Sequence, residues 1–159
     1  MRVQKSALSL LLTAAFLIAD SPFAGQWKLN PQRSRQETAN LSTARGALPR
    51  DEGIDISDQA RQLHVTVVGT AQDGSPIAFS YSIPINGGTG QLTQGGRYNR
   101  MSAVCANSNT IDNAYSRNGS RLATEHMVVS GDGQTMTVRM RGVDSNGQPV
   151  EQVLVFDKQ

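Results

Sequence analysis

Regularly spaced turn signals constrain this sequence more than any other feature. Asn-Gly and Asp-Gly pairs have backbones that accept the positive φ of tight hairpin turns. They begin at Asp73, Asn86, Asn118, Asp132 and Asn146. The first two pairs lie 13 residues apart and the last three lie 14 residues apart, with a further turn signal at 107–109 inside the long gap. This rhythm predicts an antiparallel meander of strands.

The segments between the turns alternate between apolar and polar residues. Leu63–Val68 alternates and is rich in β-branched residues, and within 77–83 and 135–141 every second residue is large and apolar. Such a period of two indicates strands with one buried and one solvent-exposed face. Arg139 and Arg141 fall on the solvent-exposed face. The segment 150–156 is more uniformly apolar, which predicts burial of both its faces. With short strands at 25–30 and 53–57, the sequence predicts nine or ten strands.

Closure of this meander into a barrel would remove its exposed edges, and an open two-sheet sandwich is the alternative. About nine strands leave an interior that side chains fill or that holds one small ligand. Residues 31–50 contain only Leu41 and Leu48 as large apolar residues. They predict a long loop across one end of the barrel, with at most a turn or two of helix. The glycine-rich stretch 86–96 predicts a long turn with a weak edge strand, or alternatively a mobile rim.

The N-terminus carries an export pattern. Arg2 and Lys5 precede an apolar run of 12 residues at 7–18, too short for the roughly 20 residues of a membrane-spanning helix. We expect residues 1–19 to be a signal peptide cleaved after Ala19, with Ala24 as a second candidate, and 20–159 to be one domain in the periplasm or secreted. A buried N-terminal helix of the fold is the alternative.

Charge and cysteine content exclude several classes of function. The chain has 15 Lys and Arg against 13 Asp and Glu, and cleavage removes Arg2 and Lys5, leaving 13 against 13. A neutral domain without a basic face argues against nucleic-acid binding. The single cysteine, Cys105, forms no internal disulfide and is expected to be a small buried residue rather than a reactive thiol. Aromatic residues make up only 5% of the chain, too few for the girdles of an outer-membrane barrel.

Three segments resemble small exported bacterial lipocalin-like proteins of the calycin group. They are Gly-Gln-Trp-Lys-Leu-Asn-Pro-Gln-Arg-Ser at 25–34, Asp-Gly-Gln-Thr-Met-Thr-Val at 132–138, and Gly-Gln-Pro-Val at 147–150 with Val-Phe-Asp-Lys at 155–158. The resemblance implies an up-and-down barrel, like those of lipocalins and fatty-acid-binding proteins, whose interior holds a small hydrophobic molecule. It also implies that Trp27 plugs the closed end. Intracellular fatty-acid-binding proteins carry Arg-x-Tyr on the last strand for the ligand carboxylate, whereas this chain has Leu154 and Phe156, which cannot form that contact.

Alternation and the resemblance together predict a ligand pocket in the barrel interior. Its predicted lining is Trp27, Phe79, Tyr81, Met101, Met136, Val138, Met140, Leu154 and Phe156. The leading hypothesis is therefore a carrier of a small hydrophobic ligand, with no cofactor and no stable membrane insertion of the mature domain. A filled, non-catalytic barrel with a structural or protein-binding role is the main alternative.

Catalytic and metal-binding patterns are weak in this sequence. His64 and His126 stand on separate predicted strands, and Glu125 points to the opposite side of the sheet from His126. No Gly-x-Ser-x-Gly elbow and no phosphate-binding loop occurs. Acidic residues gather near one short strand at 51–58, without a recognisable acid–base pair. The sequence therefore predicts no catalytic residue and no metal ligand, and an enzyme is the less favoured class.

Overall fold

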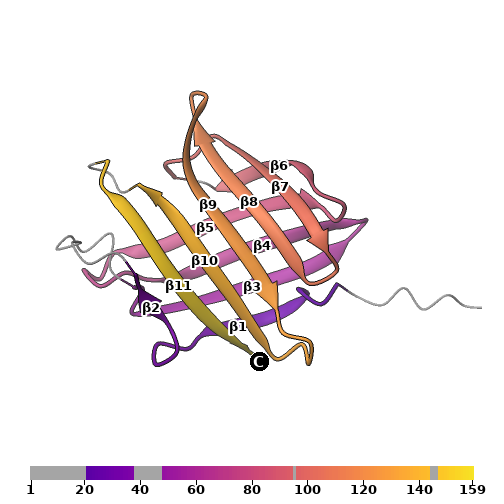
Figure 1. The fold of residues 1–159 in the computed structure, drawn as a ribbon, viewed down its shortest axis with the longest axis horizontal. Coiled ribbons are helices and arrows are strands. Elements are labelled where there is room, and N and C mark those ends of the chain that lie inside the picture. The colour runs from indigo at the N-terminus through magenta and orange to yellow at the C-terminus, as the bar shows by residue number, and fades with distance from the viewer. Residues whose placement is uncertain (1–20, 38–47, 95, 144–146) are drawn as a thin grey trace, which may run out of the picture.

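The described residues form eleven strands and no helix (Figure 1). The computed structural model describes residues 21–37, 48–94, 96–143 and 147–159. The expected signal peptide at 1–19 and residues 38–47 of the expected loop lie outside this part. Within it, no helix is long and apolar enough to cross a membrane. The strands are β1 (Gly25–Leu29), β2 (Arg35–Gln36), β3 (Asp51–Gln59), β4 (Gln62–Thr70), β5 (Pro76–Pro84), β6 (Gly88–Gln94), β7 (Arg100–Asn107), β8 (Thr110–Arg117), β9 (Ser120–Val129), β10 (Thr135–Val143) and β11 (Pro149–Lys158).

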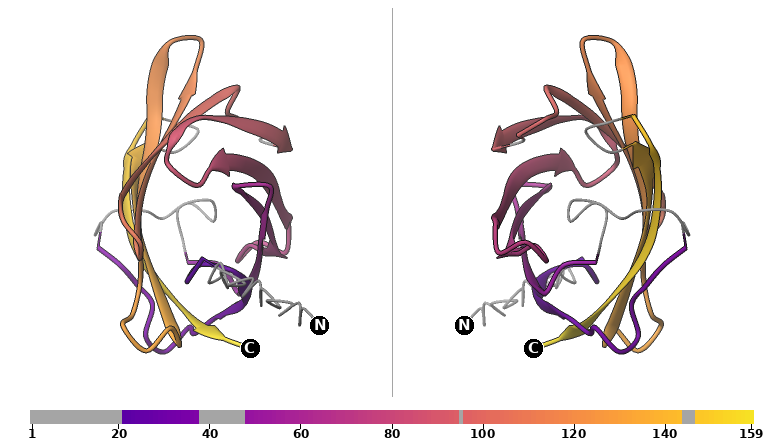
Figure 2. Two further views of the ribbon diagram at one scale, coloured as in Figure 1. Left: turned by 90° about the vertical axis from the view of Figure 1, so that its right-hand side faces the viewer. Right: turned by 90° about the vertical axis from the view of Figure 1, so that its left-hand side faces the viewer.

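Ten of these strands close into an antiparallel barrel. From β3 to β11 each strand pairs with the next in sequence, and β1 pairs with both β3 and β11. The short β2 follows β1 along the same edge of β11, where Gln36 lies opposite Gln152. Figure 2 shows the sheet curving from the β3–β5 wall to the β8–β11 wall. The predicted meander of nine or ten strands is confirmed, and the structure has the barrel rather than the open sandwich.

The predicted hairpin turns adopt the backbone that their residues favour. Asn118 and Gly119 both have positive φ, 49° and 84°, as a two-residue type I′ turn requires. One hairpin has no such signal: Ala60 and Arg61 join β3 to β4 with φ values of 51° and 64°. Left-handed backbone is uncommon at residues other than glycine. This is why the sequence predicted a strand ending near residue 57, whereas β3 continues to Gln59.

The alternation predicted from the sequence sets which side chains enter the barrel. On β10, Met136 is 0% and Val138 5% exposed, whereas Arg139 and Arg141 point outward and pair with Glu151 at 3.0 and 2.7 Å. Both faces of β11 are buried, as expected from its composition. The segment that follows β1 lies along the outer face of β11, where the Val155 backbone N–H donates a hydrogen bond to Ser34 Oγ at 2.9 Å.

Within the glycine-rich stretch at 86–96, Gly88–Gln94 form β6, which lies within the barrel wall rather than at a sheet edge or in a free rim. Three residue pairs join it to β5, with a shift in register, and three pairs join it to β7. At Gly90, a Cβ would lie 2.8 Å from Met101 Cγ and 2.9 Å from Ile83 Cγ2. The absence of a side chain at this position therefore lets two core residues pack against the β6 backbone.

The two ends of the barrel differ. In an antiparallel meander the even-numbered strands β4, β6, β8 and β10 end on one side, and β3, β5, β7 and β9 end on the other. Trp27 lies opposite Lys158, whose backbone N–H donates to Gln134 O in the β9–β10 turn. Trp27 is 1% exposed, and its indole N–H donates to Phe23 O at 2.8 Å. Trp27 and Phe23 therefore fill the end at which β9 finishes.

We expect Gly69→Ala to destabilise the barrel by about 1–3 kcal/mol, because overpacking a fixed backbone carries a cost of that size. A Cβ at Gly69 would lie 2.3 Å from Asp51 O on the neighbouring strand, whereas at Gly53 the nearest atom would be 3.7 Å away. Gly53→Ala is the matched control and is expected to change stability by less than about 0.5 kcal/mol. Urea unfolding followed by circular dichroism measures both, and equal losses would contradict the close strand approach at Gly69.

Candidate functional site

A cavity of about 660 Å³ lies inside the barrel, toward the end at which β4, β8 and β10 finish. Its wall is mainly apolar and comes from strands around the whole barrel. Val65 and Val67 come from β4, Ile77 and Phe79 from β5, and Leu154 and Phe156 from β11. Pro49, Ala71, Arg97, Arg117 and Val143 line it near the strand ends. Closure of the sheet thus produces an apolar chamber whose rim carries the charged side chains of Arg97 and Arg117.

Six of the nine residues predicted for the pocket line this cavity: Phe79, Tyr81, Val138, Met140, Leu154 and Phe156. The other three, Trp27, Met101 and Met136, are at most 1% exposed and belong to the packed core outside the cavity lining. Trp27 and Met136 lie near the filled end, and Met101 packs beside Gly90. The alternation therefore placed all nine inside the barrel but did not separate those at the filled end from those around the cavity.

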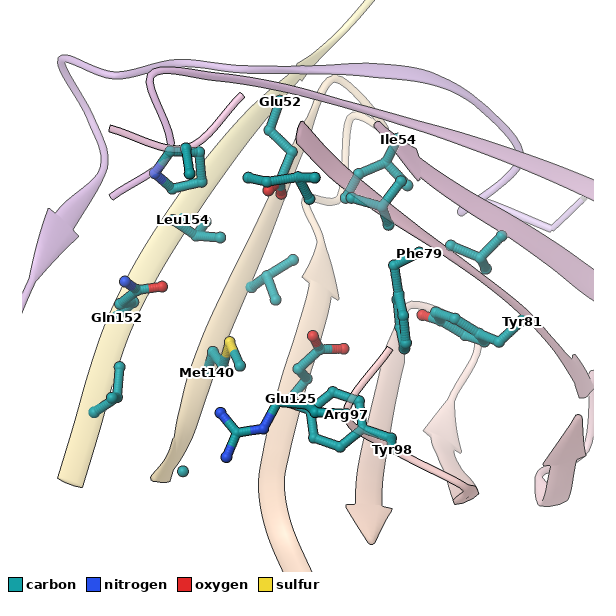
Figure 3. A pocket seen from close by; sticks show the side chains of 18 of the residues that line it. Glu52, Ile54, Phe79, Tyr81, Arg97, Tyr98, Glu125, Met140, Gln152 and Leu154 are labelled. Atoms are coloured by element: carbon teal, nitrogen blue, oxygen red, sulfur yellow. The ribbon is translucent and has the colours of Figure 1, made fainter. Parts of the chain in front are cut away.

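Four aromatic rings form one side of the interior. The Phe79 ring centroid lies 5.4 Å from that of Tyr81 and 5.5 Å from that of Tyr115, and Tyr98 stacks on Tyr115 at 5.0 Å. Figure 3 shows Phe79 and Tyr81 on one side of the cavity and Tyr98 below Glu125. Such offset and edge contacts add packing energy beyond burial of area. The rings therefore give this wall a fixed shape.

A polar cluster adjoins the aromatic wall. The Tyr115 hydroxyl donates to Glu125 Oε2 at 2.7 Å, and Asn113 Nδ2 lies 3.4 Å from the same oxygen and 3.3 Å from the Tyr81 hydroxyl. Burial raises the pKa of Glu125, and the hydrogen bonds from Tyr115 and Asn113 partly offset this. Burial, followed by the charge of Glu125, also raises the pKa of both tyrosines. The cluster is a hydrogen-bonded network centred on one carboxyl group.

A second carboxyl group, that of Glu52 on β3, also lines the cavity. Glu52 is 8% exposed. Burial, and then the nearby charges of Glu125 and Asp51, raise the pKa of Glu52 from 4.5 to about 7. In Figure 3 the Glu52 and Glu125 carboxyl groups point into the cavity from different strands. The Glu52 and Glu125 carboxyl groups can therefore bind a hydrogen-bond donor or a cation in the cavity. Glu52 can also take up or release a proton near neutral pH.

The sequence reasoning did not select Glu52, Glu125, Asn113, Tyr98 or Tyr115 for the pocket. The signal for three of them was the same alternation that placed the apolar residues. Glu52 is two residues before Ile54, Asn113 is two residues after Ile111, and Glu125 lies between Ala123 and Met127. The predicted pocket was drawn from apolar and aromatic residues alone, and polar residues at core-facing positions were not considered. Their position in the alternation instead marked buried polar groups.

Other candidate residues are placed outside the cavity lining. His126 Nδ1 lies 2.6 Å from Asp112 Oδ1 at an exposed position, on the opposite face of β9 from Glu125, as predicted. Cys105 is partly buried, and burial raises the pKa of its thiol, which makes it less reactive near neutral pH. Within the described ranges no three His, Cys, Asp or Glu side chains gather in a way that could hold a metal ion.

No protein-family model matches the chain, and no curated protein sequence matches it. Solved structures do match its fold. Zebrafish ileal bile acid-binding protein, complexed with cholic acid, is 11% identical in sequence with a TM-score of 0.51, and the match covers 87% of this chain and all of that chain. EF1p2_mFAP2b bound to DFHBI is 10% identical with a TM-score of 0.47, over 87% of this chain and 94% of that one. The closed ten-strand meander and the first of these likenesses identify the fold as a calycin-type β-barrel.

Proposed function

We propose that this protein binds one small, mainly apolar molecule inside its barrel and does so in the periplasm or outside the cell. The observation that carries the proposal is the cavity of about 660 Å³. Sites for small molecules enclose about 300–1,000 Å³ and are mostly apolar, with a few polar groups that orient the ligand. The aromatic wall and the two glutamates have this character. A barrel with a filled core would not leave such a space.

The proposed location depends on the N-terminal sequence alone. The basic start with Arg2 and Lys5, followed by the short apolar run at 7–18, is typical of a signal peptide. Cleavage after Ala19 would leave 20–159 as the mature chain. Fractionation of cells that express the full chain, with mass spectrometry of its mature N-terminus, tests both points. An intact Met1 in the cytoplasmic fraction would contradict export.

Titration with Nile red, a neutral apolar dye whose emission rises in apolar surroundings, tests the cavity. We expect saturable binding of one dye per barrel and a loss of affinity of about tenfold or more in Val138→Trp, since the added ring would occupy the chamber. Val104→Trp is the matched control, because Val104 is 63% exposed whereas Val138 is 5% exposed and lines the cavity. Circular dichroism checks that each variant is folded, and Met140→Trp serves as a second blocking variant.

Two results would overturn the proposal. One is the absence of saturable binding of Nile red by the folded wild-type barrel. The other is equal loss in the blocked and control variants, which would place the dye on the outer surface. Native mass spectrometry of protein purified from its own host then identifies a molecule that remains bound.

A further inference from the structure

Glu52 is a buried acid for which the described part of the chain supplies no compensating partner. Its residue is 8% exposed and lines the cavity, yet its carboxyl group has no hydrogen bond or ion pair with any described residue. Buried polar groups are usually hydrogen-bonded, and buried charges are usually paired. Figure 3 shows this carboxyl group directed into the cavity rather than into the wall. The group that it lacks would therefore have to come from the cavity side.

Glu125 has similar unused capacity. Both of its hydrogen bonds, from Tyr115 and Asn113, reach Oε2, so no donor from the described residues reaches Oε1. Beside it, the side-chain oxygen of Asn113 is buried, and none of the residues that the structure describes donates a hydrogen bond to it. Asn113 itself is 2% exposed. The interior thus has an excess of acceptors over donors at this point of the barrel.

The charges that face this part of the cavity favour a cation. The titratable and charged side chains that line the cavity are Glu52, Tyr81, Arg97, Tyr98, Arg117 and Glu125. The two tyrosines are neutral near pH 7, because burial raises the pKa of each. Arg97 precedes β7 and Arg117 ends β8, so both arginines belong to the rim. None of the ion pairs among the described residues involves either glutamate; those pairs lie on the outer surface.

We infer that the ligand carries a protonated amine on an apolar body, with the amine in the part of the chamber that the Glu52 and Glu125 carboxyl groups face and the body against the apolar walls that include Phe79 and Leu154. This inference rests on the proposed function, since it requires a ligand in the cavity. An ammonium group supplies up to three donors, which match the unpaired acceptors, and its charge offsets the repulsion between the two acids. Burial raises the pKa of both acids, and a bound cation would lower it again, so binding releases protons at neutral pH.

Displacement of Nile red by three ligands with the same ten-carbon chain tests the inference: decylamine, decanol and decanoate, at pH 8 and below micelle formation. Decylamine is expected to bind about tenfold or more tightly than decanol, because the charged ammonium group forms stronger hydrogen bonds with the carboxylates than a neutral hydroxyl group does. Decanoate is expected to bind most weakly. Decylamine affinity is further expected to fall on acidification from pH 8 to pH 6, as Glu52 takes up a proton.

Glu52→Gln and Glu125→Gln are expected to weaken decylamine by about tenfold and to leave decanol within about twofold. Glu37→Gln is the matched control, because Glu37 pairs with Arg139 on the outer surface at 2.7 Å. Equal affinities for decylamine and decanol would overturn the inference, as would unchanged decylamine binding in both cavity variants. Tightest binding of decanoate would also overturn it and would place a carboxylate against the rim arginines. If Nile red itself does not bind, the proposed function fails instead.

Discussion

Replacement of Trp27 by alanine is expected to destabilise the barrel by about 3–5 kcal/mol, the usual cost of removing a large buried aromatic side chain. Trp27 is 1% exposed, and its loss would also leave Phe23 O without its hydrogen bond from the indole. Because stabilities of about 5–15 kcal/mol are typical of domains, this change would remove a large fraction of the total. Urea unfolding measures the difference. Circular dichroism is the suitable signal, since Trp27 is the only tryptophan in the chain.

Val68→Ala is the control for this prediction. Val68 lies on β4 at 56% exposure, so its truncation removes little buried area and is expected to cost less than about 0.5 kcal/mol. Comparable losses in the two variants would mean that Trp27 does not anchor the filled end. A large loss of stability in Trp27→Ala together with unchanged Nile red affinity would show that the filled end stabilises the fold without taking part in ligand binding.

Glu52→Gln is expected to stabilise the empty barrel at pH 8 by about 3 kcal/mol, since one pKa unit corresponds to about 1.4 kcal/mol. The folded pKa of Glu52, about 7, lies above its ordinary value of 4.5, so the folded state binds the proton more tightly than the unfolded state. The stability that this group contributes is therefore fully present below pH 4.5 and is lost progressively as the pH rises to about 7 and beyond. Glu125 acts in the same direction, because burial raises its pKa as well.

Urea unfolding of wild type and variant at pH 4, 6 and 8 measures this dependence. The two proteins are expected to be similar in stability at pH 4 and to diverge toward pH 8, with a smaller remaining slope in Glu52→Gln due to Glu125. Glu37→Gln, on the outer surface, provides the matched control and should not flatten the profile. A wild-type stability that rises from pH 6 to pH 8 would contradict the burial of Glu52 as an unpaired acid.

The fold could be predicted because its signals are local. A pair such as Asn118-Gly119 specifies its turn from two residues, and the alternation along 135–141 specifies which side chains of β10 face inward. The exception shows the same rule, since the Ala60-Arg61 turn carries no such signal and its strand was predicted too short. Closure did not follow from these local features, because the same meander could also have formed an open two-sheet sandwich with its edges protected in other ways.

The site could be predicted only in part because its key properties are not local. A period of two gives the face of a residue but not its position along the barrel axis, so Trp27 and Met136 could not be distinguished from Val138 and Leu154. Glu52 and Glu125 stand on β3 and β9, and they share a chamber only because the five strands between them curve the sheet. Whether that chamber is empty depends on the summed volumes of all inward side chains, which no single segment determines.

The separation of the barrel into a filled end and a chambered end allows stability and ligand choice to change independently. Trp27, Phe23 and Met136 carry packing that any folded version of this chain needs. Pro49, Ala71 and Val143 border the chamber near strand ends, where insertions and substitutions are tolerated best. Mutations near those strand ends can therefore alter what enters the chamber while the structural base stays constant, a property that favours both natural divergence and laboratory evolution of new binders.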